Sequence, residues 1–135
     1  MIQKISAETN AINWFEIPVT DLQRAKEFYE NILDIKMTSP PPGQGEEMAF
    51  FPRKQDTIMA LSGTVSGALV KSERLKPSAD GALIYLNASP TLQPVIDKII
   101  ASGGKVLMPK TKIAAGYICV FIDTEGNKVA VHAAE

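Results

Sequence analysis

The two halves of the chain carry the same succession of predicted elements, and this internal repeat limits the fold more than any other feature. Residues 19–20 align with 88–89, and 56–57 align with 127–128, an offset of roughly 70 residues. Each half reads as strand, helix and three strands. The repeat predicts an α+β chain of two tandem βαβββ modules, each with its helix on one face of its sheet.

The first half supplies the clearer pattern. Residues 12–19 alternate as a strand, with Phe15, Ile17 and Val19 on one apolar face. Thr20 and Gln23 match a capping box, so a helix is expected from Thr20 to about residue 33. Further strands are predicted at 35–38, 46–51 and 57–61.

The second half repeats this order. A strand is expected at 81–88, followed by a helix with Ser89 as N-cap and Pro90 in its first turn. Gly103 and Gly104 end that helix. Strands are predicted at 105–107, 117–123 and 128–133. The expected boundaries within one domain, 1–135, are module one at about 10–62, a linker at about 63–79 and module two at about 80–135.

Charge and composition exclude several function classes. Lys and Arg number 14 against 15 Asp and Glu, so no basic excess is present for binding nucleic acid. No apolar run approaches the roughly 20 residues of a membrane span, and the polar N-terminus lacks the apolar region of a signal peptide. A single cysteine, Cys119, excludes an internal disulfide. We therefore expect a cytoplasmic protein without membrane or nucleic-acid partners.

Three stretches resemble a known family. Residues 14–29 (WFEIPVTDLQRAKEFY), 76–81 (KPSADG) and 123–132 (DTEGNKVAVH) are similar to the vicinal oxygen chelate superfamily. That superfamily includes glyoxalase I, bleomycin-resistance proteins and extradiol dioxygenases, and the chain looks most like its bacterial glyoxalase-like members. The resemblance implies a cup-shaped curved sheet with a helix outside each module, and often a homodimer.

The resemblance also implies a divalent metal held by side chains from the first and last strand of each module. In this sequence those positions fall on Trp14, Met59, Leu83 and Ala130. Trp, Leu and Ala do not ligate such cations, and Met prefers Cu(I). We therefore expect no metal or other cofactor, and glyoxalase or dioxygenase activity of the usual kind is put in doubt.

One step along the same strands lies a second set, Glu16, Leu61, Tyr85 and His132. If Glu16 and His132 face one interior, they form either a general acid–base pair or a partly buried structural pair. Tyr85 would donate to a ligand oxygen. Metal binding by the pair is a weaker alternative, because zinc sites generally use three protein ligands.

Several apolar side chains are candidates either for lining a ligand site or for packing in the core. These are Trp14, Met48, Phe50, Phe51, Met59, Leu61, Leu83, Tyr117 and Ala130. Cys119 lies between apolar neighbours and is expected to be inert.

Three functions follow. The first is a metal-free protein that binds a small organic molecule in the cup, by resemblance to the drug-sequestering members. The second is a lyase, isomerase or dioxygenase-type enzyme that uses Glu16 and His132 as acid and base or as metal ligands. The third is a regulatory module that binds a partner through residues 62–80. Whether the chain is catalytic stays open at this point.

Overall fold

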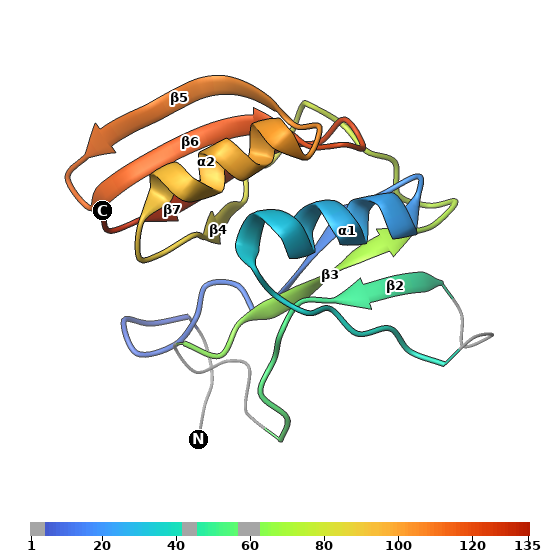
Figure 1. The fold of residues 1–135 in the computed structure, drawn as a ribbon. Coiled ribbons are helices and arrows are strands. Elements are labelled where there is room, and N and C mark those ends of the chain that lie inside the picture. Colours follow the sequence, from blue (N-terminus) through green and yellow to red (C-terminus); the bar gives the residue numbers. More distant parts are fainter. Residues whose placement is uncertain (1–4, 42–45, 57–62) are drawn as a thin grey trace.

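The computed structural model describes residues 5–41, 46–56 and 63–135. Module one contains β1 (Trp14–Pro18), α1 (Leu22–Leu33), β2 (Glu47–Phe50) and β3 (Ser66–Lys71) (Figure 1). Module two contains β4 (Tyr85–Asn87), α2 (Leu92–Ala101), β5 (Lys105–Ile113), β6 (Gly116–Ile122) and β7 (Lys128–Ala133). The chain is therefore a mixed α+β protein, as the repeat predicts.

Each module forms its own sheet, with the first strand paired in parallel to the last. The strand orders are β1-β3-β2 and β4-β7-β6-β5. Trp14 lies opposite Ser66 in the first sheet, and Tyr85 lies opposite Ala130 in the second. In both sheets the last strand of the module therefore lies in the interior beside the first, and among the described residues the second sheet has one strand more.

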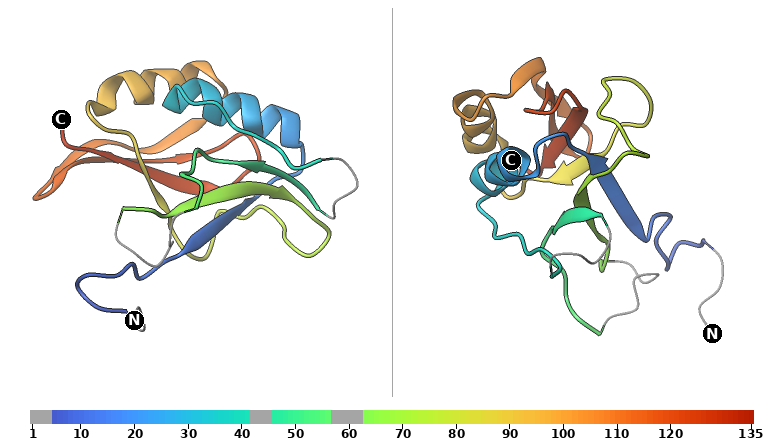
Figure 2. Two further views of the ribbon diagram at one scale, coloured as in Figure 1. Left: turned by 90° about the horizontal axis from the view of Figure 1, so that it is seen from below. Right: turned by 90° about the vertical axis from the view of Figure 1, so that its right-hand side faces the viewer.

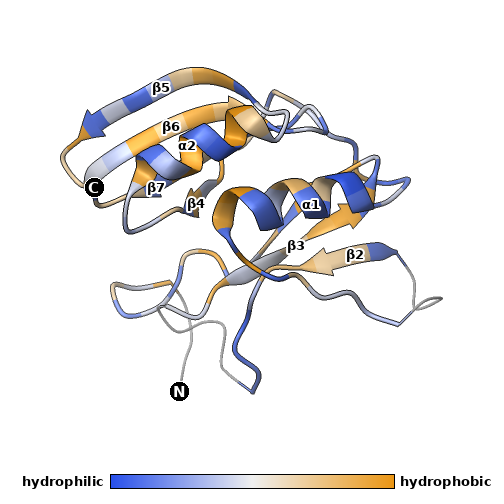
Figure 3. Ribbon diagram, in the orientation of Figure 1, coloured by the Kyte–Doolittle hydropathy of each residue, from blue (hydrophilic) through white to orange (hydrophobic). Residues whose placement is uncertain are grey.

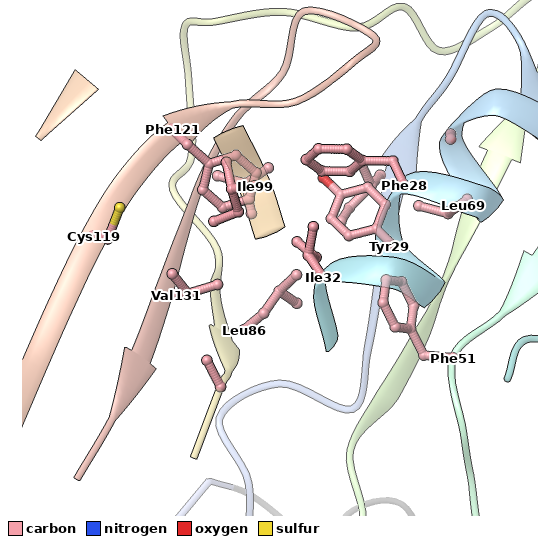
Figure 4. Close-up of a cluster of buried hydrophobic side chains, with 14 of the residues drawn as sticks. Phe28, Tyr29, Ile32, Phe51, Leu69, Leu86, Ile99, Cys119, Phe121 and Val131 are labelled. Carbon is pink, nitrogen blue, oxygen red and sulfur yellow. The ribbon is translucent and has the colours of Figure 1, made fainter. Parts of the chain in front are cut away.

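Both helices cover the same side of the two sheets, as the left view of Figure 2 shows. Residues of α1 with helical spacing, namely Ala25, Phe28, Tyr29 and Ile32, are buried against the strands. In Figure 4, Ile32 points toward Leu86 of β4, and Phe28 lies on the side of Phe121. One core therefore joins both modules. Figure 3 shows the matching pattern on α1, where hydrophobic and hydrophilic residues alternate along the helix.

The central strand of the first sheet lies where a linker is predicted. β3 spans Ser66–Lys71, inside the expected linker at 63–79, and pairs with both β1 and β2. Its sequence, SGALVK, has small residues because both faces are covered and Phe15 packs closely upon it. A Cβ added to Gly67 would lie 2.5 Å from the carbonyl oxygen of Phe15. The strand predicted at 57–61 lies outside the described residues.

Several predicted boundaries also shift. Residues 35–38 form only a bridge, Thr38 to Phe50, rather than a strand. The strand expected at 81–88 is shorter, and β5 runs on to Ile113 through register shifts around Met108 that accommodate Pro109. The remaining strands of module two and both helices lie close to their predicted positions.

Both helix N-caps are one or two residues later than predicted. Asp21, not Thr20, caps α1 by accepting from the backbone N–H of Arg24 at 3.0 Å. Thr20 instead donates its N–H and hydroxyl to Glu125. Thr91, not Ser89, precedes α2, and the N–H of Leu92 donates to the backbone of Glu135 at 2.8 Å. Tertiary partners decide these helix starts.

A buried polar network ties the two modules together. The Tyr29 hydroxyl of α1 donates to Asp123 at 2.6 Å, and Asp123 also accepts from the backbone N–H groups of Glu125 and Asn127. Asn127 in turn donates to the carbonyl oxygen of Pro18 at 2.7 Å. Burial and the Asp123 charge raise the pKa of Tyr29 well above its usual value. This network therefore joins α1 and the end of β1 in module one to the turn between β6 and β7 in module two.

Candidate functional site

The sheet face opposite the helices, called here the open face, carries the candidate site residues. Strand register places alternate residues on it. In module one these include Trp14, Glu16, Phe50 and Ala68, and in module two Tyr85, Asn87, Ala130, His132 and Ile118. Ala68, Val70, Ile118, Val120 and Ala130 are buried but lie outside the helix-side core, consistent with this face.

The structure corrects the alignment of the two last strands. The N–H of Val19 donates to Val70, and the N–H of Ala88 donates to His132. Val70 therefore corresponds to His132, and Ala68 to Ala130. The position assigned to Met59 from sequence belongs to Ala68, because module one is longer than module two before its last strand. Met59 and Leu61 lie outside the described residues.

The corrected positions do not fit a divalent metal. The four positions that the resemblance assigns to metal ligands hold Trp14, Ala68, Leu83 and Ala130. An indole N–H only donates, and alkyl side chains have no ligating atom. Among residues 5–41, 46–56 and 63–135, no group of three or more His, Cys, Asp or Glu side chains could hold a metal ion.

In module one, polar side chains on the open face bind one another. Trp14 donates its indole N–H to Glu16 at 3.4 Å, and the Arg74 guanidinium lies 3.5 Å from the other Glu16 oxygen. Arg74 also pairs with Glu46 at 2.8 Å, and Ser72 donates to Glu46. These two donors lower the pKa of Glu46.

Aromatic contacts complete this side. The Trp14 and Phe50 rings meet edge to face with centroids 6.0 Å apart, and the Arg53 guanidinium lies 4.9 Å from the Phe50 centroid. Trp14 and Phe50 are half-buried. Both predicted candidates therefore pack against each other on the open face.

In module two, the open face is hollowed into a cavity of about 430 Å³. Its lining residues are Tyr85, Leu86, Asn87, Ile113, Ala115, Ile118 and His132. His132 Nε2 lies 2.7 Å from the carbonyl oxygen of Ala115, in the turn between β5 and β6. The predicted residues Tyr85 and His132 thus share one cavity.

The predicted pairing of Glu16 with His132 is wrong. Glu16 binds Trp14 and Arg74, while His132 binds Ala115. Glu16 borders a different cavity, of about 200 Å³, between the edges of the two sheets. The sequence places both residues on the correct face, but each binds other partners and borders a different cavity.

Two further predicted residues lie away from the cavity. Tyr117 is on the helix side of β6 and packs against the core, with Lys110 Nζ 4.5 Å from its ring centroid. Its role as a cavity wall is therefore wrong. Phe51 is also part of the core. Cys119 is fully buried there, and burial raises the pKa of its thiol, as expected for an inert cysteine.

Sequence reasoning missed Asn87 and the turn residue Ala115. Asn87 follows Tyr85 by two residues and aligns with His132, so strand alternation alone could have placed it on the open face. Ala115 carries no chemical signal in the sequence, because its backbone carbonyl makes the contact. Arg74 was likewise hidden in the predicted linker.

Comparisons with known proteins agree on one family. The family model "Glyoxalase/Bleomycin resistance protein/Dioxygenase superfamily" matches residues 11–131. A glyoxylase-like domain-containing protein of Didymella fabae is 32% identical over 124 residues, covering 89% of this chain and 91% of that protein. The Mycobacterium bovis protein CFP32 is 27% identical over 121 residues, and this chain spans only 44% of its length.

A solved structure gives the same fold. The glyoxalase/bleomycin resistance protein from Albidiferax ferrireducens T118 matches with a TM-score of 0.67 and 17% identity. The match covers 90% of this chain and 97% of that one. At this identity the likeness concerns the fold alone. Among the described residues, no helix is both long and apolar enough to cross a membrane.

Proposed function

Since this chain belongs to the glyoxalase/bleomycin resistance protein/dioxygenase superfamily, we propose that it binds a small organic molecule without a metal ion, in the cavity beside His132. The proposal depends above all on one observation. The open face of module two is hollow at His132 and Tyr85, whereas the metal positions hold side chains that cannot ligate.

The size and lining of the cavity support small-molecule binding. Ligand cavities in proteins generally measure about 300 to 1,000 Å³ and combine apolar walls with a few polar groups. The cavity beside His132 has about 430 Å³, with Ile113 and Ile118 as apolar walls. Tyr85, Asn87 and His132 supply the polar groups.

The donor set supports binding without a metal. Replacing a ligand by Ala68 or Ala130 removes every coordinating atom at that position, and both alanines are fully buried. Elemental analysis of the purified protein, prepared without chelator, should find no stoichiometric metal. Zinc, nickel or iron binding at one equivalent on titration would contradict this part of the proposal.

The binding itself is tested with a matched pair of variants. Ala115 and Ala114 are exposed neighbours in one turn, but only Ala115 lines the cavity. Ala115→Phe should fill the cavity and abolish binding of fragments that shift the backbone amide signals of Ile118 and His132 in an NMR screen. Ala114→Phe should leave their binding unchanged. Equal binding by both variants, or no fragment at these residues, would contradict the proposal.

A second candidate is a lyase or isomerase, because an imidazole and a phenol border the same cavity. In that case His132 would move a proton and Tyr85 would donate to a substrate oxygen. Turnover that disappears in His132→Ala and falls in Tyr85→Phe, with both variants folded, would favour this candidate. Turnover that survives His132→Ala would exclude it.

A further inference from the structure

The hydrogen-bonding direction of two cavity side chains is fixed by the backbone around them. These side chains are His132 on β7 and Asn87 on β4, register partners in the second sheet. One polar atom of each side chain forms a hydrogen bond with a backbone group. Because each backbone group can act in one direction only, it decides what the remaining polar atom offers a ligand.

His132 offers an acceptor. Its Nε2 lies 2.7 Å from the Ala115 carbonyl oxygen, and a carbonyl oxygen only accepts, so Nε2 carries the proton. In the neutral imidazole the other nitrogen, Nδ1, is then unprotonated and accepts hydrogen bonds. Nδ1 makes no hydrogen bond to any residue in the described part of the chain.

Asn87 offers a donor. The backbone N–H of Ser89 donates to Asn87 Oδ1 at 2.9 Å, and an N–H only donates. This contact fixes the orientation of the side-chain amide and leaves the Nδ2 group, with its two N–H donors, for other partners. Within the described ranges Nδ2 has no hydrogen-bond partner.

The residues that carry the acceptor and the donor are register partners on neighbouring strands. Neighbouring strands are about 4.8 Å apart, and register partners project to the same face. Asn87 and His132 both line the cavity. A ligand that meets both must therefore present a donor and an acceptor next to each other.

The rest of the lining favours a flat and uncharged ligand. None of the seven described residues that line the cavity is Asp, Glu, Lys or Arg. Tyr85, two residues before Asn87 on the same face, adds an aromatic ring, and Ile113 and Ile118 add apolar surface.

We propose that the cavity recognises an uncharged, planar cyclic amide through the edge on which its N–H and C=O are adjacent. The N–H donates to His132 Nδ1, and the C=O accepts from Asn87 Nδ2. This assignment rests on the proposed function and names the ligand class of the same cavity.

A set of related small molecules tests the assignment by NMR titration of the intact chain. The probe is 2-pyridone, whose lactam form presents this edge. N-methyl-2-pyridone lacks the N–H and should bind about fivefold more weakly or worse, the effect of losing one net hydrogen bond. Benzoate and benzamidine carry a negative and a positive charge on rings of similar size, and both should bind more weakly than 2-pyridone.

Variants locate the contacts. Asn87→Leu and His132→Leu should each weaken 2-pyridone binding about fivefold and abolish the preference over the N-methyl compound. Asn31→Leu, an exposed asparagine on α1, is the matched control and should change neither. Because both cavity variants lie on strands, their thermal midpoints are measured alongside. Should either fail to fold, Asn87→Asp and His132→Phe, which lack the donor and the acceptor respectively, replace them and should lose the same preference.

The outcomes separate this inference from the proposed function. Equal affinity for 2-pyridone and its N-methyl form, or tighter binding of benzoate or benzamidine at the same amides, would overturn the ligand class and leave the cavity as a binding site. Absence of shifts at Ile118 and His132 with every probe, including apolar ones, would overturn both.

Discussion

On the open face, the polar side chains of module one bind one another, whereas two polar side chains of module two each keep a hydrogen-bonding atom that no described residue uses. Glu16 and Glu46 are held by Trp14, Ser72 and Arg74. His132 and Asn87 each keep one polar atom without a partner among the described residues. The two modules thus pair their first and last strands alike, but they differ in whether the polar side chains on the open face are bound to one another.

This difference between the open faces of the two modules depends on the segment that follows the last strand of each module. Residues 72–80, which leave β3, bring Arg74 over module one. In module two the residues that follow β7 lie against the start of α2 instead, where the N–H of Leu92 and the hydroxyl of Thr91 donate to Glu135. The connecting segments therefore add to the chemistry that the strand residues of each module present.

The largest expected effect comes from breaking the connection between the modules. Asp123→Ala removes the acceptor of Tyr29 and of two backbone N–H groups, so buried donors lose their partner. We expect a loss of about 3 kcal/mol in the free energy of unfolding, measured by urea denaturation. Asp97→Ala, an exposed aspartate on α2, is the control, and equal losses in both would contradict a special role for Asp123.

Gly67→Ala tests why the central strand of module one differs from that of module two. The added Cβ would meet the Phe15 carbonyl at 2.5 Å, which forces backbone movement between β1 and β3. The expected loss is about 2 kcal/mol by the same measurement. A variant as stable as the parent would show that β1 and β3 can separate without cost.

Glu125→Gln tests how the contacts of Glu125 with the start of α1 stabilise the protein as a function of pH. The Glu125 carboxylate accepts from Arg24 and from the N–H groups of Thr20 and Asp21. Burial opposes its ionisation, but these hydrogen bonds outweigh burial and lower its pKa to about 2.

A native pKa below the unfolded value of about 4.3 stabilises the fold at higher pH, and this stabilisation is lost as pH falls toward 2. At pH 7 the variant should be about 1–2 kcal/mol less stable, after allowance for solvent around Arg24. The difference in the free energy of unfolding between the parent and the variant, measured by urea denaturation, should be smaller at pH 3 than at pH 7. Glu27→Gln, on the exposed surface of α1, should show no such narrowing.

The smallest effect on stability is expected from Arg74, which binds Glu16 and Glu46 on the open face of module one. Arg74 is largely exposed, so Arg74→Gln should change the free energy of unfolding by less than about 0.5 kcal/mol. It should also leave 2-pyridone binding in module two unchanged. Weaker binding in this variant would show that the two faces act as one site, and the comparison would fail.

The sequence correctly predicted the sheet face of the candidate residues whose placement needed only strand alternation. Alternation placed Glu16, Tyr85 and His132 opposite the core, and all three lie on the open face. It failed for the contact between Glu16 and His132, since alternation gives a direction but no distance between two sheets. It also failed for Tyr117, where the assignment as a wall had no strand register behind it.

The sequence alone was enough to predict both helices, most strands of module two and the absence of ligating side chains at Trp14 and Ala130. These are local properties of periodicity and residue type. Only the tertiary structure decided that SGALVK is a central strand, that Asp21 caps α1, and that His132 donates to Ala115. The strand pairing and the His132 contact depend on partners distant in sequence, and Asp21 becomes the cap because the distant Glu125 binds Thr20.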